Sequence, residues 1–252
     1  MLRLGLIGFC AAALIAVVSA PMPAHAADAL STADRAQIEQ IIHDYLVNHP
    51  EVLIDALKAA EAKARADQED AARAALKSRE DDILRDPTSP VGGNPKGDVT
   101  IVEFFDYRCP YCKQVEPAIE TLLKEDLQVR VVYKEFPILG PDSVTAARVA
   151  LAAAKQGPQQ YARFHSAMMS TKGQINESVI MKVAQDSGLD MAKVKADMKS
   201  PEVEAIIQRN YALADVLDIK GTPAFIVGDK VAPGAIDVGE LRKMVAAARN
   251  PG

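Results

Sequence analysis

Between residues 31 and 60, apolar residues recur at helical spacing among polar side chains. Ser31 or Thr32 can cap a helix, whose apolar positions then follow on one side: Ile38, Ile41, Ile42, Tyr45 and Leu46. Pro50 suits the first turn of a second helix with a similar stripe: Val52, Leu53, Ala56, Leu57 and Ala60. Two short amphipathic helices have no core of their own to cover. We therefore expect residues 31–60 to bury these stripes against copies of the chain, as a homo-oligomer.

The apolar pattern fades beyond Lys58. From there to Arg85 the chain is mostly Ala, Glu, Lys, Arg, Asp and Gln, which are strong helix formers with few large apolar groups. This composition predicts a solvated helical spacer, about 40 Å long at the rise of an α-helix. Residues 86–94 hold two prolines and two glycines, so they predict a linker that ends the spacer and begins a new domain.

Apolar runs of strand length begin at Val99. Runs at 99–105 and 128–136 enclose a predicted helix at 112–124, and this strand–helix–strand order predicts a parallel pair. Helical segments follow up to about Ile219, and a strand pair at 224–227 and 230–232 precedes a last helix at 238–249. An α/β domain results. We interpret Lys134 and Glu135 as surface charges, and the methionines of the helical segments as core: Met168, Met169, Met181, Met191 and Met198.

The extreme N-terminus has the pattern of a secretory signal peptide. Arg3 gives the positive start, Leu4 to Val18 is an uncharged apolar run, and Ala24-His25-Ala26 forms a cleavage site. The run is shorter than the roughly 20 residues of a spanning helix, which argues against a membrane anchor. We expect residues 1–26 to be removed and the mature protein to be exported to the periplasm.

Composition excludes some functions. The net charge of −5 gives no basic field for nucleic acid, and we expect no nucleic-acid partner. The sequence contains three cysteines, and cleavage of the signal would leave only Cys109 and Cys112. The loop that such a pair closes is small, so a disulfide there restricts the unfolded chain little. In an oxidising compartment the pair is better explained by chemistry than by stability.

Cys109 lies where the first predicted strand gives way to a helix. Free backbone N–H groups and the helix dipole favour an anion there, so the pKa of Cys109 is expected to fall below the usual value of about 8.5. Cys112, one turn later, is expected to be buried and to remain a thiol. Exchange would form a mixed disulfide on Cys109 that Cys112 releases. Two alternatives are an inert bridge and half of a zinc site, but a zinc site needs four ligands and His43, His49 and His165 lack ligand spacing. We predict no metal site and no cofactor.

Two motifs carry a resemblance to a known family. Phe104 to Lys113, read as Phe-Phe-Asp-Tyr-Arg-Cys-Pro-Tyr-Cys-Lys, resembles the active-site segment of the DsbA-like thioredoxin-fold disulfide oxidoreductases of the periplasm. Gly221 to Phe225 resembles the cis-proline loop of that family. The resemblance covers about residues 86–249. The N-terminal helices are similar to those of oligomeric members, of which the suppressor-of-copper-sensitivity protein C group is the nearest.

The resemblance implies a domain plan. Residues 27–86 would be an N-terminal helical oligomerisation arm and spacer. Residues 87–252 would be a thioredoxin fold with an inserted helical domain at about 139–219. Thr222 and Pro223 would bind an extended substrate chain, with Pro223 in the cis form that is nearly confined to proline.

The resemblance also implies roles around the cysteines. Pro110 and Tyr111 would adjust the reduction potential of the Cys109–Cys112 pair. Glu103 matches the buried acid of the family, which could shuttle the proton of Cys112; the alternative is a strand glutamate that faces solvent.

These features lead to one interpretation with stated alternatives. We interpret the chain as an exported protein disulfide oxidoreductase, and the arm with Thr222 favours an oligomeric isomerase or reductase. Its partners would be cysteine-containing exported proteins and a membrane redox partner that resets the pair. The alternatives are a monomer-like dithiol oxidase, and a copper-tolerance protein whose reduced thiols bind Cu(I). In a third alternative, the helical arm carries the function of the protein and the redox domain does not.

Overall fold

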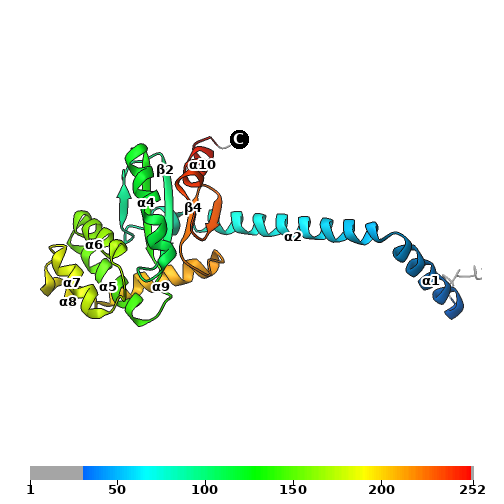
Figure 1. Ribbon diagram of the computed structural model, residues 1–252, viewed down its shortest axis with the longest axis horizontal. Helices are drawn as coiled ribbons and strands as arrows, with labels where there is room; N and C mark the ends of the chain where they lie inside the picture. Colours follow the sequence, from blue (N-terminus) through cyan, green and yellow to red (C-terminus); the bar gives the residue numbers. More distant parts are fainter. Residues whose placement is uncertain (1–30, 251–252) are drawn as a thin grey trace, which may run out of the picture. The chain divides into compact units, whose positions relative to one another are not determined.

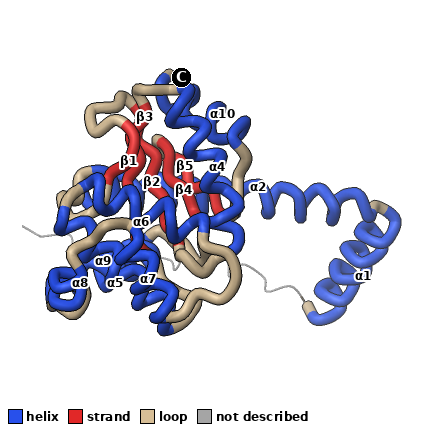
Figure 2. Tube along the Cα trace, turned by 60° about the vertical axis from the view of Figure 1, so that its left-hand side comes forward, coloured by secondary structure: helices blue, strands red, loops and turns tan. Residues whose placement is uncertain are grey.

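The computed structural model describes residues 31–250, which form two compact units, up to Glu61 and from Ala62. The predicted signal peptide, residues 1–26, lies outside the described residues. Figures 1 and 2 show the helices and strands.

The first unit consists of α1 (Thr32–Asn48) and the first turns of α2 (Pro50–Ser78). Ser31 caps α1: its hydroxyl accepts from the Asp34 N–H at 3.1 Å, and the Asp34 carboxylate accepts from the Ser31 N–H at 3.3 Å. Large apolar side chains of this unit are exposed: Ile38, Ile41, Ile42, Tyr45, Val47, Val52, Leu53, Ile54 and Leu57. Among residues 31–61, no side chain is buried.

The second unit is built on a five-stranded sheet of order β1-β3-β2-β4-β5. The strands are β1 (Val91–Gly93), β2 (Val99–Phe105), β3 (Val129–Glu135), β4 (Ala224–Val227) and β5 (Lys230–Pro233). β2 and β3 are parallel, which confirms the predicted strand–helix–strand unit, and the other neighbours are antiparallel. The predicted strand pair at 224–232 is the β4–β5 hairpin.

Both faces of the sheet are buried, and the side chains of each strand alternate between them. One face of β2 presents Ile101, Glu103 and Phe105 toward α4 (Pro110–Glu125) and α10 (Val238–Arg249). The other face presents Val102 and Phe104 toward α3 (Glu80–Leu84), the end of α2 and the end of α9 (Pro201–Val216). This alternation places Glu103 under the helix that carries the cysteines.

The helical insertion contains α5 (Pro141–Gln156), α6 (Pro158–Ser170), α7 (Glu177–Asp186), α8 (Met191–Asp197) and α9. Figures 1 and 2 show α5 to α8 gathered beside the sheet. These helices confirm the helical segments expected up to about Ile219. Met168, Met169 and Met198 are buried, and Met181 and Met191 pack partly buried against the same cluster, so the methionines do fill the core.

The solvated spacer predicted up to Arg85 was wrong at its end. Leu76 is 6% exposed and Ile83 is 2% exposed, and both belong to the core cluster that covers one face of the sheet. The helix also breaks at Arg79, where α3 begins. Because the segment is rich in alanine, its pattern did not indicate that these two large apolar side chains pack on the domain.

The linker predicted at residues 86–94 was wrong in part, because it contains the edge strand β1. Val91 to Gly93 pair with Arg130 to Val132 of β3. Gly93 has a φ of 66°, and a Cβ at this position would lie 2.5 Å from the Val129 carbonyl oxygen. The glycines that signal a linker are therefore needed for a close approach between strands.

Lys134 and Glu135 were wrongly interpreted as surface charges, since each is 1% exposed. The Lys134 ammonium donates to the Asp82 carbonyl at 2.7 Å, the Asp86 carboxylate at 3.0 Å and the Ser89 hydroxyl at 2.8 Å. It thereby fixes the segment between α3 and β1 on the sheet.

Candidate active site

The cysteine pair begins α4, directly after the sheet. Cys109 is the N-cap residue of α4, Pro110 occupies its first turn, and Cys112 follows inside the helix. The loop from β2 is held by Asp106, whose carboxylate accepts from the backbone N–H groups of Arg108 at 2.8 Å and Leu139 at 3.0 Å. This role of Asp106 was not predicted from the sequence. The signal that could have indicated it is an acidic residue three positions before a helix N-terminus.

The environment of Cys109 favours its thiolate. A hydrogen bond from the Cys112 thiol lowers the pKa of Cys109 to about 5, against the effect of burial. The Thr222 side chain and the backbone N–H groups of Cys112 and Tyr111 contribute to the same shift. These N–H groups are the free donors of a helix N-terminus, so the structure supports the electrostatic argument made from the sequence.

The environment of Cys112, in contrast, favours its protonated thiol. It is fully buried, and both cysteines are free thiols in the structure. Its hydrogen bond to Cys109, its burial and the charge of Glu103 raise the pKa of Cys112. The pair thus offers one anionic sulfur and one protonated sulfur, which suits attack by the first and resolution by the second.

Glu103 is fully buried on β2, between Tyr133 of β3 and Phe225 of β4. Burial raises the pKa of Glu103 well above its usual range, and the charges of Glu116 and Cys109 add to this effect. Among residues 31–250, no group forms a hydrogen bond to either carboxyl oxygen of Glu103. The alternative of a solvent-facing strand glutamate is therefore excluded.

The Thr222-Pro223 segment closes the site opposite α4. The peptide bond before Pro223 is cis, and the Pro223 carbonyl accepts from the Gly234 N–H at 2.8 Å. The Cys109 sulfur lies 3.2 Å from the Thr222 carbonyl oxygen. This segment and the cysteines come together although they are far apart in the sequence.

Pro110 and Tyr111 lie at the surface of the site. Pro110 is exposed, and the Tyr111 side chain is 60% exposed. Cys109 itself is only 4% exposed. Pro110 and Tyr111 are thus the exposed residues of the motif, and Cys109 is buried beside them.

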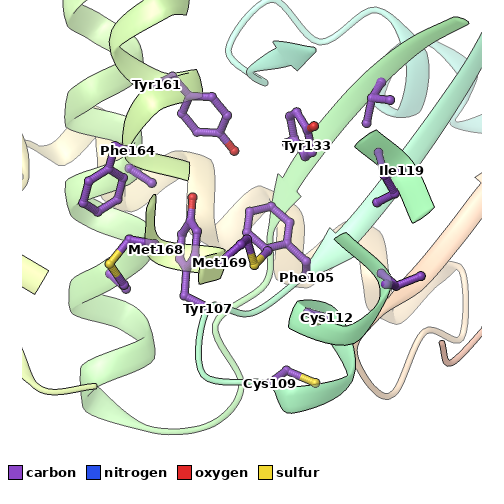
Figure 3. Packing of buried hydrophobic residues seen from close by; sticks show 14 of the residues in the cluster. Phe105, Tyr107, Cys109, Cys112, Ile119, Tyr133, Tyr161, Phe164, Met168 and Met169 are labelled. Atoms are coloured by element: carbon purple, nitrogen blue, oxygen red, sulfur yellow. The ribbon is translucent and has the colours of Figure 1, made fainter. Parts of the chain in front are cut away.

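A buried polar cluster, also missed in the sequence, lies between α4 and α6. The carboxyl group of Glu135 accepts from the hydroxyls of Tyr107 at 3.3 Å and Tyr161 at 3.2 Å. His165 lies 3.0 Å from the Tyr107 hydroxyl through Nδ1 and 3.5 Å from the Glu116 carboxylate through Nε2. Figure 3 shows Tyr107 and Tyr161 of this cluster above the cysteines. No sequence spacing links residues drawn from a strand, a loop and two helices.

Among residues 31–250, no group of three or more His, Cys, Asp or Glu side chains is placed to hold a metal ion. Within the same range, no helix is long and apolar enough to cross a membrane.

Comparison with family models gives two matches. The DSBA-like thioredoxin domain matches residues 100–246, which is more than half of the chain. The N-terminal domain of the copper resistance protein ScsC matches residues 34–67.

Solved structures resemble the chain over long stretches. A thioredoxin-like oxidoreductase from Silicibacter pomeroyi is 45% identical with a TM-score of 0.66, over 68% of this chain and 98% of that chain. Proteus mirabilis ScsC in a transitional conformation is 30% identical with a TM-score of 0.66, over 87% of this chain and 99% of that chain.

Curated relatives include disulfide proteins and antiporters. The thiol:disulfide interchange protein DsbA of Bordetella parapertussis is 30% identical over 145 residues, which are 56% of this chain and 68% of that protein. The Na(+)/H(+) antiporter NhaA 3 of Salinispora tropica is 30% identical over 184 residues. The chain spans only 28% of the length of that antiporter.

Proposed function

The chain belongs to the family of DsbA-like thioredoxin domains, and from this premise we propose that it is an exported protein disulfide oxidoreductase that works as an oligomeric isomerase. The observation that carries the proposal is the asymmetry of the pair: Cys109 is a stabilised thiolate at a helix N-terminus, and Cys112 is a buried thiol behind it. The pattern of residues 1–26 supports export to the periplasm.

The proposed reaction begins with the reduced pair. The Cys109 thiolate attacks one sulfur of a substrate disulfide, so a Cys109–substrate disulfide forms and the other substrate sulfur leaves as a thiolate. That thiolate can attack a different disulfide of the substrate, and the last sulfur then displaces Cys109. The substrate exchanges its pairing with no net transfer of electrons, which is isomerisation.

The alternative exit from the mixed disulfide uses Cys112. Its thiol loses a proton and attacks the Cys109 sulfur; a Cys109–Cys112 disulfide forms, the substrate thiolate leaves, and two electrons pass to the substrate. We assign this proton to Glu103, because its charge acts on Cys112 and its raised pKa brings it closer to that of a thiol. A membrane redox partner would then reduce the pair again.

The oligomer part of the proposal rests on the first unit. Its apolar side chains are exposed over two helices, with exposed fractions of 61% for Ile41 and 64% for Leu57. Contiguous apolar surface of this kind is typical of an interface. An assembly through residues 31–60 would hold several Cys109 sulfurs around one substrate, which favours isomerisation over simple oxidation.

Binding of Cu(I) is a second candidate, which the match of residues 34–67 to a copper resistance protein favours. Two thiolates are soft ligands that suit Cu(I). Titration of the reduced protein with Cu(I), beside a Cys109→Ser variant, tests it: binding that is equal in both proteins contradicts a role of the pair.

Trapping tests the principal proposal. A Cys112→Ser variant cannot resolve the mixed disulfide, so mass spectrometry is expected to find a disulfide-bearing peptide attached to Cys109. A Cys109→Ser variant is expected to trap none. Equal trapping by the two variants would contradict the proposed roles of the cysteines.

A further inference from the structure

Asp106, the first residue after β2, is a buried carboxylate with both oxygens engaged. It is 1% exposed. One oxygen accepts from the Arg108 N–H at 2.8 Å, and the other accepts from the Leu139 N–H at 3.0 Å. A buried charge is costly unless hydrogen bonds compensate it, and here backbone N–H groups supply them. The carboxylate therefore joins two segments that are distant in the sequence.

The first segment is the turn that leads into the cysteine helix. The Asp106 carbonyl accepts from the Cys109 N–H at 3.0 Å, which closes a four-residue turn at 106–109. The bond from the Arg108 N–H to the carboxylate adds an Asx turn, in which an aspartate accepts from the residue two positions ahead. The Asp106 N–H also forms a hydrogen bond to the Cys112 sulfur. The backbone of this one residue thus contacts both members of the pair.

The second segment is the entry to the helical insertion. Leu139 precedes Gly140, the N-cap residue of α5. The Leu139 N–H donates to the Asp106 carboxylate, and the Leu139 carbonyl accepts from the Arg108 guanidinium. Both polar backbone groups of Leu139 are therefore bonded to the turn that carries Cys109. Loss of the carboxylate would remove one of these two contacts and the Asx turn together.

The position of this turn matters because directed contacts stabilise the Cys109 thiolate. The Cys112 thiol is the largest cause that lowers the pKa of Cys109, and the backbone N–H groups of Cys112 and Tyr111 add to it. Hydrogen bonds weaken steeply when donor and acceptor are misaligned. A small rotation of the turn would therefore move the Cys109 sulfur away from these donors.

We propose that Asp106 is a positioning residue for disulfide exchange: its carboxylate fixes the turn so that the Cys109 sulfur lies against the first N–H groups of α4. The inference rests on the proposed function and adds to it a residue that acts through the cysteines and does not itself react. It also gives the helical insertion a part in the site, because Leu139 supplies one of the two donors to the carboxylate.

The sign of the change at Cys109 separates positioning from a simple effect of charge. A carboxylate near a thiolate disfavours it, so loss of the charge alone would lower the pKa of Cys109. Asp106→Asn keeps the size of the side chain, but its NH₂ group cannot accept a hydrogen bond, so one of the two contacts is lost. Because the sulfur then loses alignment, we expect the pKa of Cys109 to rise by about one unit, the scale of one hydrogen bond.

Two readouts on the full chain test this expectation. The pKa of Cys109 is measured from the ultraviolet absorbance of its thiolate as the pH is varied. The equilibrium of the pair with reduced and oxidised glutathione at pH 7 should shift about tenfold toward the Cys109–Cys112 disulfide, since the thiolate is less stabilised. Asp142→Asn is the matched control, because it removes a carboxylate from the first turn of α5 and keeps the bonds of Asp106. We expect the control to leave both readouts unchanged. A pKa of Cys109 in Asp106→Asn at or below the wild-type value overturns the inference.

Hydrogen exchange gives a further test that needs no substitution. In wild-type protein, the amides of Arg108 and Leu139 are expected to be protected, because each donates to the Asp106 carboxylate. Exchange of both amides at the rate of an unstructured chain would show that the contacts do not form, and would overturn the inference even if the variant failed to fold.

The two levels of the proposal fail differently. If the pair of the wild-type protein does not exchange with glutathione, or if Cys109 titrates at the usual value of a thiol, the proposed function fails. If the wild type exchanges and its thiolate is stabilised, but Asp106→Asn changes neither readout, only the positioning role is refuted.

Discussion

The Cys109 sulfur lies 3.2 Å from the carbonyl oxygen of Thr222, and 113 positions separate the two residues in the sequence. In the proposed reaction Cys109 supplies the nucleophile, and Thr222 belongs to the segment that is expected to bind the substrate chain. The fold therefore brings the attacking atom and the proposed substrate backbone to the same point.

Cys109 is expected to titrate near pH 5, because hydrogen bonds stabilise its thiolate. The rate of alkylation of reduced protein, followed against pH, should show its midpoint there rather than at the usual pKa of about 8.5. A Cys112→Ser variant is expected to keep a depressed midpoint, since the backbone N–H groups remain. A wild-type midpoint above pH 8 would contradict the assignment of the nucleophile.

The same shift couples stability to pH. The folded-state pKa of Cys109 lies below the unfolded one, so its contribution to the free energy of unfolding is complete above about pH 8.5. It is lost as the pH falls toward about 5. Urea unfolding of reduced protein should show this loss between the two values, and a Cys109→Ala variant should not show it.

Glu103→Gln should slow the resolution step. The amide keeps the size of the carboxyl group but cannot accept the Cys112 proton, and loss of such a group costs about 100-fold in rate. Stopped-flow measurement of peptide reduction is expected to show this loss, with the alkylation midpoint of Cys109 still below its usual value. An unchanged resolution rate would mean that the proton leaves by another route.

Lys134→Met should destabilise the fold. It removes the ammonium from a buried contact and leaves the Asp86 carboxylate without its charge partner, at a cost of about 3 kcal/mol. Because burial lowers the pKa of Lys134, the intact pair adds little net stability, and the double variant with Asp86→Asn is expected to recover part of the loss. Urea unfolding checks both, and a single variant as stable as wild type would contradict the contact.

Asp86 gives this contact its own pH signature. Burial acts to raise the pKa of Asp86, but the Thr88 hydrogen bonds and the Lys134 charge outweigh it and lower the pKa to about 2. Its contribution is complete above the unfolded pKa of about 3.9 and is lost as the pH falls toward 2. Asp86→Asn should lose less stability across that interval than wild type does.

Ile41→Asp should weaken self-association. Ile41 is 61% exposed in the stripe of α1, and a carboxylate in an apolar interface is costly to desolvate. Light scattering is expected to show smaller particles for this variant than for Ala36→Asp, an exposed position of α1 away from the stripe. A monomeric wild-type protein would contradict the oligomer proposal at once.

Local patterns predicted much of the fold. The parallel β2–β3 pair, the β4–β5 hairpin and the helices of the insertion followed from periodicity and from Gly and Pro breaks. The pattern failed where tertiary contacts decide. Leu76 and Ile83 are isolated apolar residues in a charged helix, and β1 is a strand of three residues containing two glycines.

The site divides in the same way. Cys109, Cys112, Thr222 and Pro223 stand in short motifs, and the structure brings them together. The burial of Glu103, Lys134 and Glu135 could not be read from their strands, because both faces of this sheet are covered and a charged residue gives no sign of a partner. Their contacts come from loops and helices distant in sequence, such as Asp86 and Tyr161.

The most direct test of the account is reactivation of scrambled ribonuclease by reduced protein that starts at Ala27, beside a form that starts at Ala62. The cut is placed at Ala62 because removal of all residues up to 86 would also remove Leu76 and Ile83 from the core. The account predicts that the longer form reactivates ribonuclease, whereas the shorter form only exchanges disulfides with a peptide. Equal reactivation by both forms would contradict the role of the arm, and reactivation by neither would contradict the isomerase itself.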